Sequence, residues 1–362
     1  MTACGPNRFS TFGSRKASRR KPNPPVTSTI IGKLRRNGLR FLIALLIVTV
    51  AASALYYVLR DIAPDQVVAA LKAQSGRCIA IACIFVVAGY VTLTFYDYFA
   101  LRTIDRPDVP FAVAAFASFT SYTIGHTLGA ATVTGGAVRL RIYSAWGLTV
   151  LDIAKIAFVT GMTFWLGNAV VLGSALTYAP EAASAVDRLP IDINRFIGVS
   201  ALLAYAGYLL WLLPRQRFVG YRDWRIALPN VRFTLIQSAI GATDLCLVTL
   251  AIYVLLPAEP AVDFPAVLVI FLTATLLGTV SHAPGSIGVL EAAILFGLPQ
   301  FPKEKLLATL LIFRVLYFLI PLCFATLIFS FRELRVIVRP TLSSFYSRYR
   351  QGSAFEHARR DR

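Results

Sequence analysis

The residues with the clearest chemical potential lie in a short segment around residue 285. Apolar sequence runs from residue 267 to residue 298, and polar or helix-breaking residues interrupt it at His282, Pro284, Gly285, Gly288 and Glu291. Inside lipid, backbone groups that Pro and Gly leave free must be satisfied within the protein, so such a break is tolerated where it faces protein or a wet cavity. The ionisable group beside it is therefore a candidate binding residue. The alternative is a surface loop between two short helices, with Glu291 at the positive end of the second helix.

A second glycine-rich segment carries arginines in place of a carboxylate. Gly135 and Gly136 precede Arg139 and Arg141, and we expect the glycines to form a turn that opens a short helix. An arginine holds a phosphate with a fork of two N–H groups, and glycines let backbone N–H groups approach the same anion. The pattern therefore indicates an anion site. The alternative is that both arginines only anchor the segment at the membrane surface, with their charged ends in the polar head groups.

Carboxylates within apolar sequence form a third set of candidates: Asp97, Asp244 and Glu291. Together they can bind a cationic head group, carry a proton, or neutralise Arg139 and Arg314. An unpaired charge at the centre of a membrane helix costs at least ~2.5 kcal/mol, so Asp244 and Glu291 should have a partner or a wet site. Asp97 lies near a helix end, where solvation at the interface is the alternative.

The last apolar run contains Arg314 and Tyr317, three residues apart on one helical face, followed by Pro321. Proline frees a carbonyl near Tyr317 and kinks the helix. We expect this face to point toward Glu291. The alternative is a structural arginine that binds a helix carbonyl.

Other polar residues have less specific roles. His126 and His282 are expected to hydrogen-bond to the broken backbone. Asp152 and Lys155 should form an i, i+3 pair at the membrane surface. The cysteines and histidines lack the spacing of metal ligands, so no metal and no other cofactor is expected.

The composition is that of an integral membrane protein. Hydrophobic residues make up 57% of the 362 residues and charged residues only 15%, whereas charged residues are about a quarter of a soluble protein. The net charge of +18 is concentrated in residues 1–40, 214–232 and 332–362, which indicates three cytoplasmic segments. Basic tails also attract anionic lipid. They lack interleaved aromatic residues, so nucleic acid is not an expected partner.

The apolar runs predict six membrane spans and two re-entrant hairpins. The predicted spans are residues 41–59, 78–99, 150–178, 196–213, 233–256 and 306–330. Segments 111–140 and 265–298 should each enter and leave on one side, because a single crossing by either would put a basic loop outside. Both chain ends are then cytoplasmic, in the inner membrane of a bacterium.

The expected fold is thus an all-α polytopic membrane protein with about eight membrane segments in two repeats. Each repeat reads span, span, hairpin, span, and three crossings per repeat invert the second relative to the first, as in many transporters. The expected parts are a disordered basic tail 1–40, repeats 41–178 and 196–330, a periplasmic loop 179–195 and a basic tail 331–362.

Over residues 41–330 the chain resembles the membrane (flippase) module of the bacterial lysylphosphatidylglycerol synthase/flippase family, also called multiple peptide resistance factor. The likeness rests on Gly125-His126-Thr127-Leu128-Gly129, Thr134-Gly135-Gly136-Ala137-Val138-Arg139-Leu140-Arg141-Ile142-Tyr143, Ala283-Pro284-Gly285-Ser286-Ile287-Gly288-Val289-Leu290-Glu291, and Arg314-Val315-Leu316-Tyr317-Phe318-Leu319-Ile320-Pro321. Ser286 stands where the family often has a further glycine.

This resemblance implies transfer of an aminoacylated phospholipid from the inner to the outer leaflet. No counterpart of the family's soluble synthase domain follows the last span, so we expect a stand-alone module. Members of the wider superfamily with this module alone include some in hopanoid or polysaccharide-lipid pathways, which leaves the lipid open.

We therefore expect a lipid translocase that is not an enzyme, with membrane phospholipids, such as aminoacylated phosphatidylglycerol, as its partners. One alternative is the membrane subunit of a lipid-modifying enzyme, although the sequence contains no nucleotide loop, metal cluster or serine elbow. The other is a protein that recruits a separate lipid synthase through its basic tails.

Overall fold

Long apolar runs form helices in lipid because a helix satisfies its own backbone hydrogen bonds. The computed structural model describes residues 69, 72, 74–128, 131–213, 217–221, 224–281 and 284–333. Within these residues, helices occupy nearly all of the chain. The expected tail 1–40 and the expected first span 41–59 lie outside them, as does most of the tail 331–362.

Six helices in the described part of the chain are long and apolar enough to cross a membrane. They are α3 (Gly76–Thr103), α6 (Val150–Tyr178), α8 (Ile191–Leu212), α9 (Val231–Leu255), α10 (Phe264–Ser281) and a last helix, Lys303–Glu333. The prediction of a polytopic helical membrane protein is confirmed at this level. Five of the helices correspond to expected spans, and α10 is the first arm of the expected second hairpin.

Side-chain caps fix where two of these helices begin. Thr149 and Asp152 form a capping box at the start of α6, in which the Thr149 N–H donates to Asp152 at 2.8 Å. Among the described residues Asp152 binds Thr149 and forms no ion pair with Lys155, contrary to expectation. Asn230 caps α9 by accepting a hydrogen bond from the Phe233 N–H at 2.9 Å. Such caps satisfy backbone donors that have no partner within the helix.

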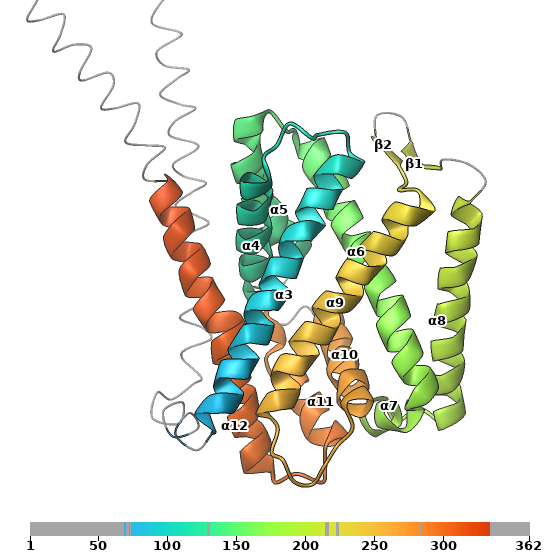
Figure 1. The fold of residues 1–362 in the computed structure, drawn as a ribbon, viewed down its shortest axis with the longest axis vertical. Coiled ribbons are helices and arrows are strands. Elements are labelled where there is room, and N and C mark those ends of the chain that lie inside the picture. The colour runs from blue at the N-terminus through green and yellow to red at the C-terminus, as the bar shows by residue number, and fades with distance from the viewer. Residues whose placement is uncertain are drawn as a thin grey trace, which may run out of the picture. The chain divides into compact units, whose positions relative to one another are not determined.

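Two pairs of shorter helices reverse the chain direction. The first pair is α4 (Phe111–Leu128) and α5 (Ala131–Tyr143), which pack against each other in the upper part of Figure 1. In the second pair, α10 is followed by a 3-10 turn, η2 (Pro284–Ser286), and by α11 (Val289–Gly297). Helix α11 returns along α10, because a Cβ added to Gly297 would lie 2.6 Å from Ile270.

The structure corrects three local expectations. Gly135 and Gly136 lie inside α5 and do not form a turn before it. The expected loop 179–195 contains the short helix α7 (Pro180–Asp187) and the start of α8. The basic segment 214–232 contains two antiparallel strands, β1 (Phe218–Tyr221) and β2 (Trp224–Ala227), so the fold is not entirely helical.

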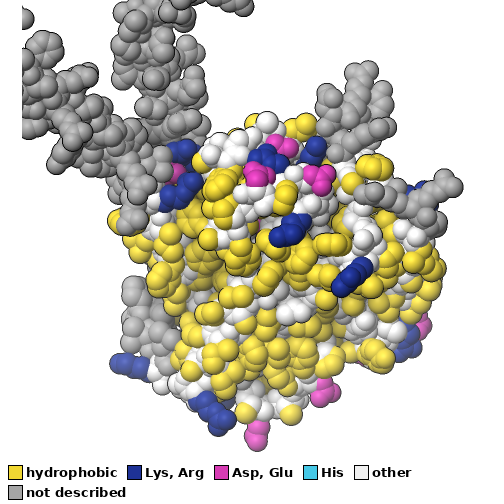
Figure 2. Space-filling view, turned by 45° about the horizontal axis from the view of Figure 1, so that its top comes forward, with side chains coloured by type: hydrophobic (Ala, Val, Ile, Leu, Met, Phe, Trp, Pro, Cys, Tyr) yellow, Lys and Arg dark blue, Asp and Glu magenta, His cyan; other side chains and the backbone are white. Residues whose placement is uncertain are grey.

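Close helix crossings depend on glycines. A Cβ added to Gly167 of α6 would lie 2.5 Å from the carbonyl carbon of Gly241 in α9, so the two backbones are in contact there. Small residues at such crossings are typical of membrane helix interfaces. Apolar side chains cover much of the surface, and charged side chains gather mainly toward its upper and lower edges (Figure 2).

Candidate functional site

A buried ion pair joins α5, the second helix of the first pair, to α3. The guanidinium of Arg139 binds Asp97 with two nitrogens: Nη2 donates to Oδ1 at 2.7 Å and Nε donates to Oδ2 at 2.9 Å. The side chain of Asp97 is fully buried and that of Arg139 is 6% exposed. This fork geometry is the one with which arginine recognises carboxylates and phosphates.

Two tyrosines complete this site. The Tyr143 hydroxyl, one turn beyond Arg139 on α5, donates to Oδ2 of Asp97 at 2.9 Å. The Arg139 guanidinium lies over the ring of Tyr122 in α4, 4.9 Å from its centroid. Three helices therefore converge on one charge pair, which has polar and aromatic partners that offset its loss of solvation.

Gly135 lets α5 approach α4 closely enough to form this site. An added Cβ there would lie 3.0 Å from the Ser121 carbonyl oxygen and 3.7 Å from Nη1 of Arg139. Gly136, by contrast, has nothing within 4 Å of an added Cβ. The two expected glycines thus differ in role, because only Gly135 lies against neighbouring backbone.

The break between α10 and α11 is held by a second ion pair, which joins α11 to α12 (Lys303–Arg314). Nε and Nη2 of Arg314 both lie 2.5 Å from Oε1 of Glu291. Nη1 of Arg314 donates to the carbonyl of Gly285 at 3.0 Å. The other oxygen of Glu291 accepts the Gly288 N–H at 2.8 Å, which caps α11. The expectation that the Arg314 face points toward Glu291 is confirmed.

The backbone of this break needs its glycines. Gly285 and Gly288 have φ angles of 57° and 81°, which glycine adopts without a steric cost. Ser286 also has a positive φ of 51°, an uncommon conformation for a residue with a Cβ. Ser286, where the resembled family often has glycine, therefore stands at a position whose backbone conformation suits glycine better than serine. Pro284 is the first residue of the turn η2.

The end of α4 lies against the turn of the second helix pair. Helix α4 contacts η2, and an added Cβ on Gly285 would lie 3.7 Å from the Thr127 carbonyl oxygen at the end of α4. The same Cβ would lie 3.6 Å from Nη1 of Arg314. The end of α4 and the turn η2 are thus in contact beside the Glu291–Arg314 pair.

Asp244 is a buried carboxylate whose environment differs from those of Asp97 and Glu291. It is 8% exposed on α9 and accepts a hydrogen bond from the Tyr96 hydroxyl of α3 at 3.2 Å. Among the described residues it forms no ion pair. Asp97 and Glu291 are neutralised by arginines, whereas Asp244 has a neutral hydroxyl as its partner.

Pro321 changes the last helix near Tyr317. Helix α12 passes into a π-helical turn, η3 (Val315–Leu319), and returns to α-helix as far as Glu333. Proline cannot donate to the carbonyl four residues earlier, which is that of Tyr317. The hydroxyl of Tyr90 in α3 donates to this carbonyl at 2.9 Å. The freed group is thus satisfied by another helix, and π-turns of this kind are frequent at functional sites.

The remaining candidates take no part in these two ion pairs. Arg141 forms an ion pair with Glu333 at the end of the last helix. His126 makes an edge contact with the ring of Tyr122, with 5.5 Å between the ring centroids. His282 lies outside the described residues. Within those residues, no group of three or more His, Cys, Asp or Glu side chains is arranged to hold a metal ion.

Sequence reasoning did not include the tyrosines at positions 90, 96, 122 and 143 among the site residues. Tyr143 had a usable signal, because it lies four residues after Arg139 and therefore on the same face of α5. Tyr90 and Tyr96 had none in the local pattern, since their partners are 227 and 148 residues away.

Comparisons with known proteins agree with the membrane class. No family model matches the chain. It is 32% identical to the uncharacterized protein slr0712 of Synechocystis sp. over 241 residues, which are 66% of this chain and 74% of that protein. It is 30% identical to the inner membrane protein YbhN of Escherichia coli over 223 residues, which are 60% of this chain and 68% of that protein.

The likeness to a lysylphosphatidylglycerol synthase is shorter than the motifs implied. A segment of 72 residues, 19% of this chain, is 36% identical to a phosphatidylglycerol lysyltransferase of Staphylococcus haemolyticus, of which it covers 9%. The two longer alignments define the relationship. The chain is a multi-pass inner membrane protein and belongs to the YbhN family.

Proposed function

We propose that this protein moves a phospholipid between the two leaflets of the inner membrane. The observation that supports this most strongly is the presence of two ion pairs among the packed helices: Asp97–Arg139, which is buried, and Glu291–Arg314, which lies beside the contact between α4 and η2. Charges inside a membrane protein are expensive and typically mark a substrate pathway. Both pairs also stabilise the fold, but well-packed apolar side chains could do this at no greater cost, so a role in binding charged groups accounts for the use of charges at these positions.

In this proposal the α4–α5 and α10–α11 pairs are re-entrant hairpins that enter the membrane from opposite faces. The reversal of the chain within each pair supports this, as does their location in the upper and lower parts of Figure 1. The two halves of the chain are then an inverted repeat with both termini in the cytoplasm, and the contact between α4 and η2 lies near the middle of the membrane.

The transport step is an exchange of ionic partners. Arg139 releases Asp97 and takes the lipid phosphate in the same fork geometry. Glu291 releases Arg314 and takes a cationic group on the head group. The exchange releases Asp97 and Arg314 from their ionic partners; Asp97 keeps the hydroxyl of Tyr143 and Arg314 keeps the carbonyl of Gly285 as hydrogen-bond partners, which limits the cost of the release. No bond is made or broken, and the protein is not an enzyme in this proposal.

A head group with both a phosphate and an amine fits such a pair of sites. The short likeness to phosphatidylglycerol lysyltransferases points to an aminoacylated phosphatidylglycerol or a related lipid, made by a separate synthase. The lipid class is thus inferred from the two charges that Arg139 and Glu291 would bind, a phosphate and an amine.

Leaflet transfer in proteoliposomes tests this function. A fluorescent aminoacylated phosphatidylglycerol is quenched in the outer leaflet, and the rate of its transfer is measured for wild type, Arg139→Lys and Glu291→Gln. Lysine keeps the charge of Arg139 but loses the fork, and glutamine at position 291 has no charge to bind the cationic group. Both variants should therefore reduce transfer at least tenfold.

Arg106→Gln is the matched control. Arg106 forms a similar forked pair with Asp108, at 2.9 and 3.0 Å, in the exposed turn between α3 and α4. These hydrogen bonds lower the pKa of Asp108. The control should transfer lipid at the wild-type rate. Wild-type transfer by Arg139→Lys and Glu291→Gln would contradict the mechanism. Complete loss of a lipid species on gene deletion, in place of a changed leaflet distribution, would favour a subunit of a lipid-modifying enzyme.

A further inference from the structure

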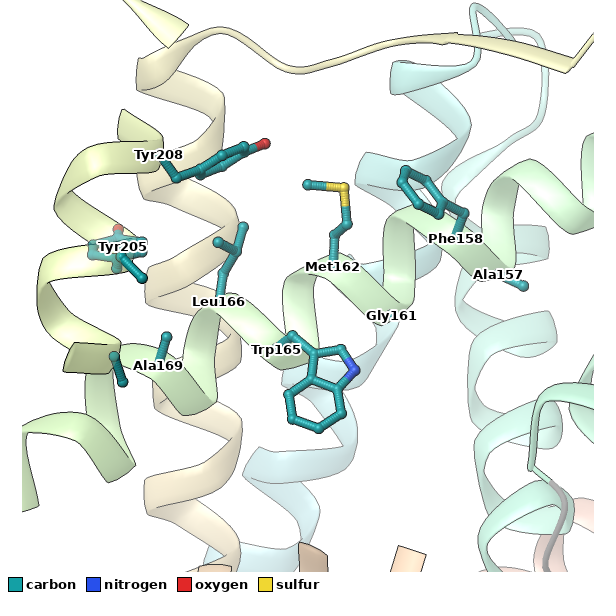
Figure 3. Close-up of a pocket in the computed structure, with 11 residues that line it drawn as sticks. Ala157, Phe158, Gly161, Met162, Trp165, Leu166, Ala169, Tyr205 and Tyr208 are labelled. Carbon is teal, nitrogen blue, oxygen red and sulfur yellow. The ribbon is translucent and has the colours of Figure 1, made fainter. Parts of the chain in front are cut away.

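A groove between α6 and α8 lies apart from the paired arginines. It has a volume of 580 Å³, within the range of about 300–1,000 Å³ that is usual for ligand pockets. Its lining is apolar and aromatic, from Gly161, Met162 and Trp165 on α6 and from Ala201, Tyr205 and Tyr208 on α8 (Figure 3).

The groove follows from how the two helices cross. At one end they touch, because a Cβ added to Gly198 would lie 2.8 Å from the Gly173 carbonyl oxygen. From that contact α6 and α8 draw apart toward β1 and β2 (Figure 1). The lining from Ala157 to Ala169 extends about 18 Å along α6 at 1.5 Å per residue. One leaflet of hydrocarbon is about 15 Å deep, half of the full core, so the groove matches the depth of one leaflet.

The groove is continuous with the lipid-facing surface of the protein. Trp165 on its rim is 59% exposed, and Leu203 and Leu210 of α8 beside it are 67% and 65% exposed. In an inner membrane protein such surface is in contact with lipid chains. The occupant that the surroundings supply is therefore an acyl chain.

Polar groups at the wide end fit the rest of a phospholipid. Lys155 lies one turn before Phe158 on α6 and forms no ion pair with any described residue. Arg217, after α8, lies over the ring of Trp211 at 5.0 Å and hydrogen-bonds to the Trp211 carbonyl. Both cations lie at the wide end, which favours an anionic head group. The acid nearest to Lys155 along α6, Asp152, is occupied by the capping box, and Asp105 lines a smaller pocket with Lys155.

One polar atom inside the groove lacks a partner. The Tyr208 hydroxyl oxygen is buried and makes no hydrogen bond within the described part of the protein. In Figure 3 it points from α8 across the groove toward Met162. A buried hydroxyl without a partner costs free energy, and an ester carbonyl of a phospholipid at this depth would accept its hydrogen bond.

We propose that the α6–α8 groove is a binding site for one anionic phospholipid of the leaflet on the β1–β2 side. The acyl chain occupies the groove, the Tyr208 hydroxyl donates to an ester carbonyl, and Lys155 binds the phosphate. The site would hold this lipid whether or not the protein transports lipid.

Native mass spectrometry of the full-length protein tests the site. The protein is equilibrated in micelles that contain phosphatidylglycerol and phosphatidylcholine, and the retained lipids are counted. Gly161→Leu fills the groove, and nothing lies within 4 Å of an added Cβ at that position. Gly207→Leu on α8 is the control, since it also has nothing within 4 Å and does not line the groove.

Gly161→Leu should retain one phosphatidylglycerol fewer than wild type, and Gly207→Leu should retain the wild-type number. Lys155→Gln should lower the ratio of bound phosphatidylglycerol to phosphatidylcholine about fivefold, the effect of about 1 kcal/mol for one cation near a charged lipid. Equal retention in the two glycine variants would overturn the proposal. So would a wild-type dimer that Gly161→Leu dissociates, because a second copy would then occupy the groove.

Discussion

The Asp97–Arg139 pair offers a quantitative test through a double-mutant cycle. Asp97 is fully buried and accepts hydrogen bonds from Arg139 and Tyr143. Asp97→Asn leaves a buried guanidinium without a counter-charge, and Arg139→Gln leaves a buried carboxylate without one. Each single change should destabilise the protein by about 3–5 kcal/mol. The double variant contains no charge at this site, so it should lose far less than the sum of the two.

The cycle should therefore give a coupling energy of at least about 2 kcal/mol, in the upper part of the range for contacting residues. The free energy of unfolding is measured for the four proteins in micelles by denaturant titration, with helical circular dichroism as the signal. The control cycle uses Asp108→Asn and Arg106→Gln, an exposed pair with the same fork geometry. Water screens that pair, so its coupling should be much weaker.

The double variant also separates stability from function. If the pair only stabilises the fold, Asp97→Asn with Arg139→Gln should transfer lipid at nearly the wild-type rate once it folds. The exchange mechanism predicts a well-folded double variant with little transfer, because Arg139 no longer receives the phosphate. A coupling energy near zero would refute the reasoning about the buried pair, and a fully active double variant would refute its role in transport.

Two further predictions concern packing. Tyr90→Phe should lower the free energy of unfolding by about 1–3 kcal/mol, because the Tyr317 carbonyl loses its donor. The loss should be smaller in a Pro321→Ala background, where residue 321 regains an N–H. The drop in melting temperature caused by Tyr90→Phe is compared in the two backgrounds, and equal drops would contradict this prediction. Gly167→Ala should destabilise the protein at the α6–α9 crossing by about 1–3 kcal/mol. Gly207→Ala is the control: nothing lies near its added Cβ, so it should be neutral or stabilising by up to about 1 kcal/mol. Similar changes in melting temperature for the two variants would contradict the close contact between the backbones of α6 and α9.

Much of the helical framework could be predicted from apolar periodicity and breakers alone. Helix α6 spans Val150–Tyr178, the expected residues, because the apolar run that predicted it has the same bounds. The Glu291–Arg314 pair was also within reach. Glu291 follows a Pro/Gly break and Arg314 lies on an otherwise apolar helix, so each needed a partner of opposite charge.

The neighbours of Asp97 could not be predicted in the same way. Its pairing with Arg139 requires α3 and α5 to be adjacent, a tertiary fact that no local pattern contains. Of the three roles considered for the carboxylates, the structure has Asp97 and Glu291 neutralising arginines. Gly135 and Gly136 were expected in a turn because glycine is a poor helix former, but close packing of Gly135 on Ser121 outweighs that preference.

The small elements were missed for a related reason. The segment 214–232 was read through its charge, which hid the alternation that pairs Val219 with Ile226 in the β1–β2 hairpin. Helix α7 is eight residues long, too short for periodicity to distinguish it from a loop.

The contact between the end of α4 and η2 is the central claim, and cross-linking in membranes tests it most directly. Leu128→Cys at the end of α4 and Ile287→Cys beside η2 are introduced in a cysteine-free protein, together with a protease site between α8 and β1. After a short bifunctional thiol reagent and cleavage in membrane vesicles, the two fragments should remain joined. In the control, Leu128→Cys is combined with Lys303→Cys at the start of α12, which lies in the second fragment about 16 Å along the helix from Arg314 at 1.5 Å per residue; these fragments should separate. Separation of the fragments in the first protein, or equal joining in both, would contradict the account.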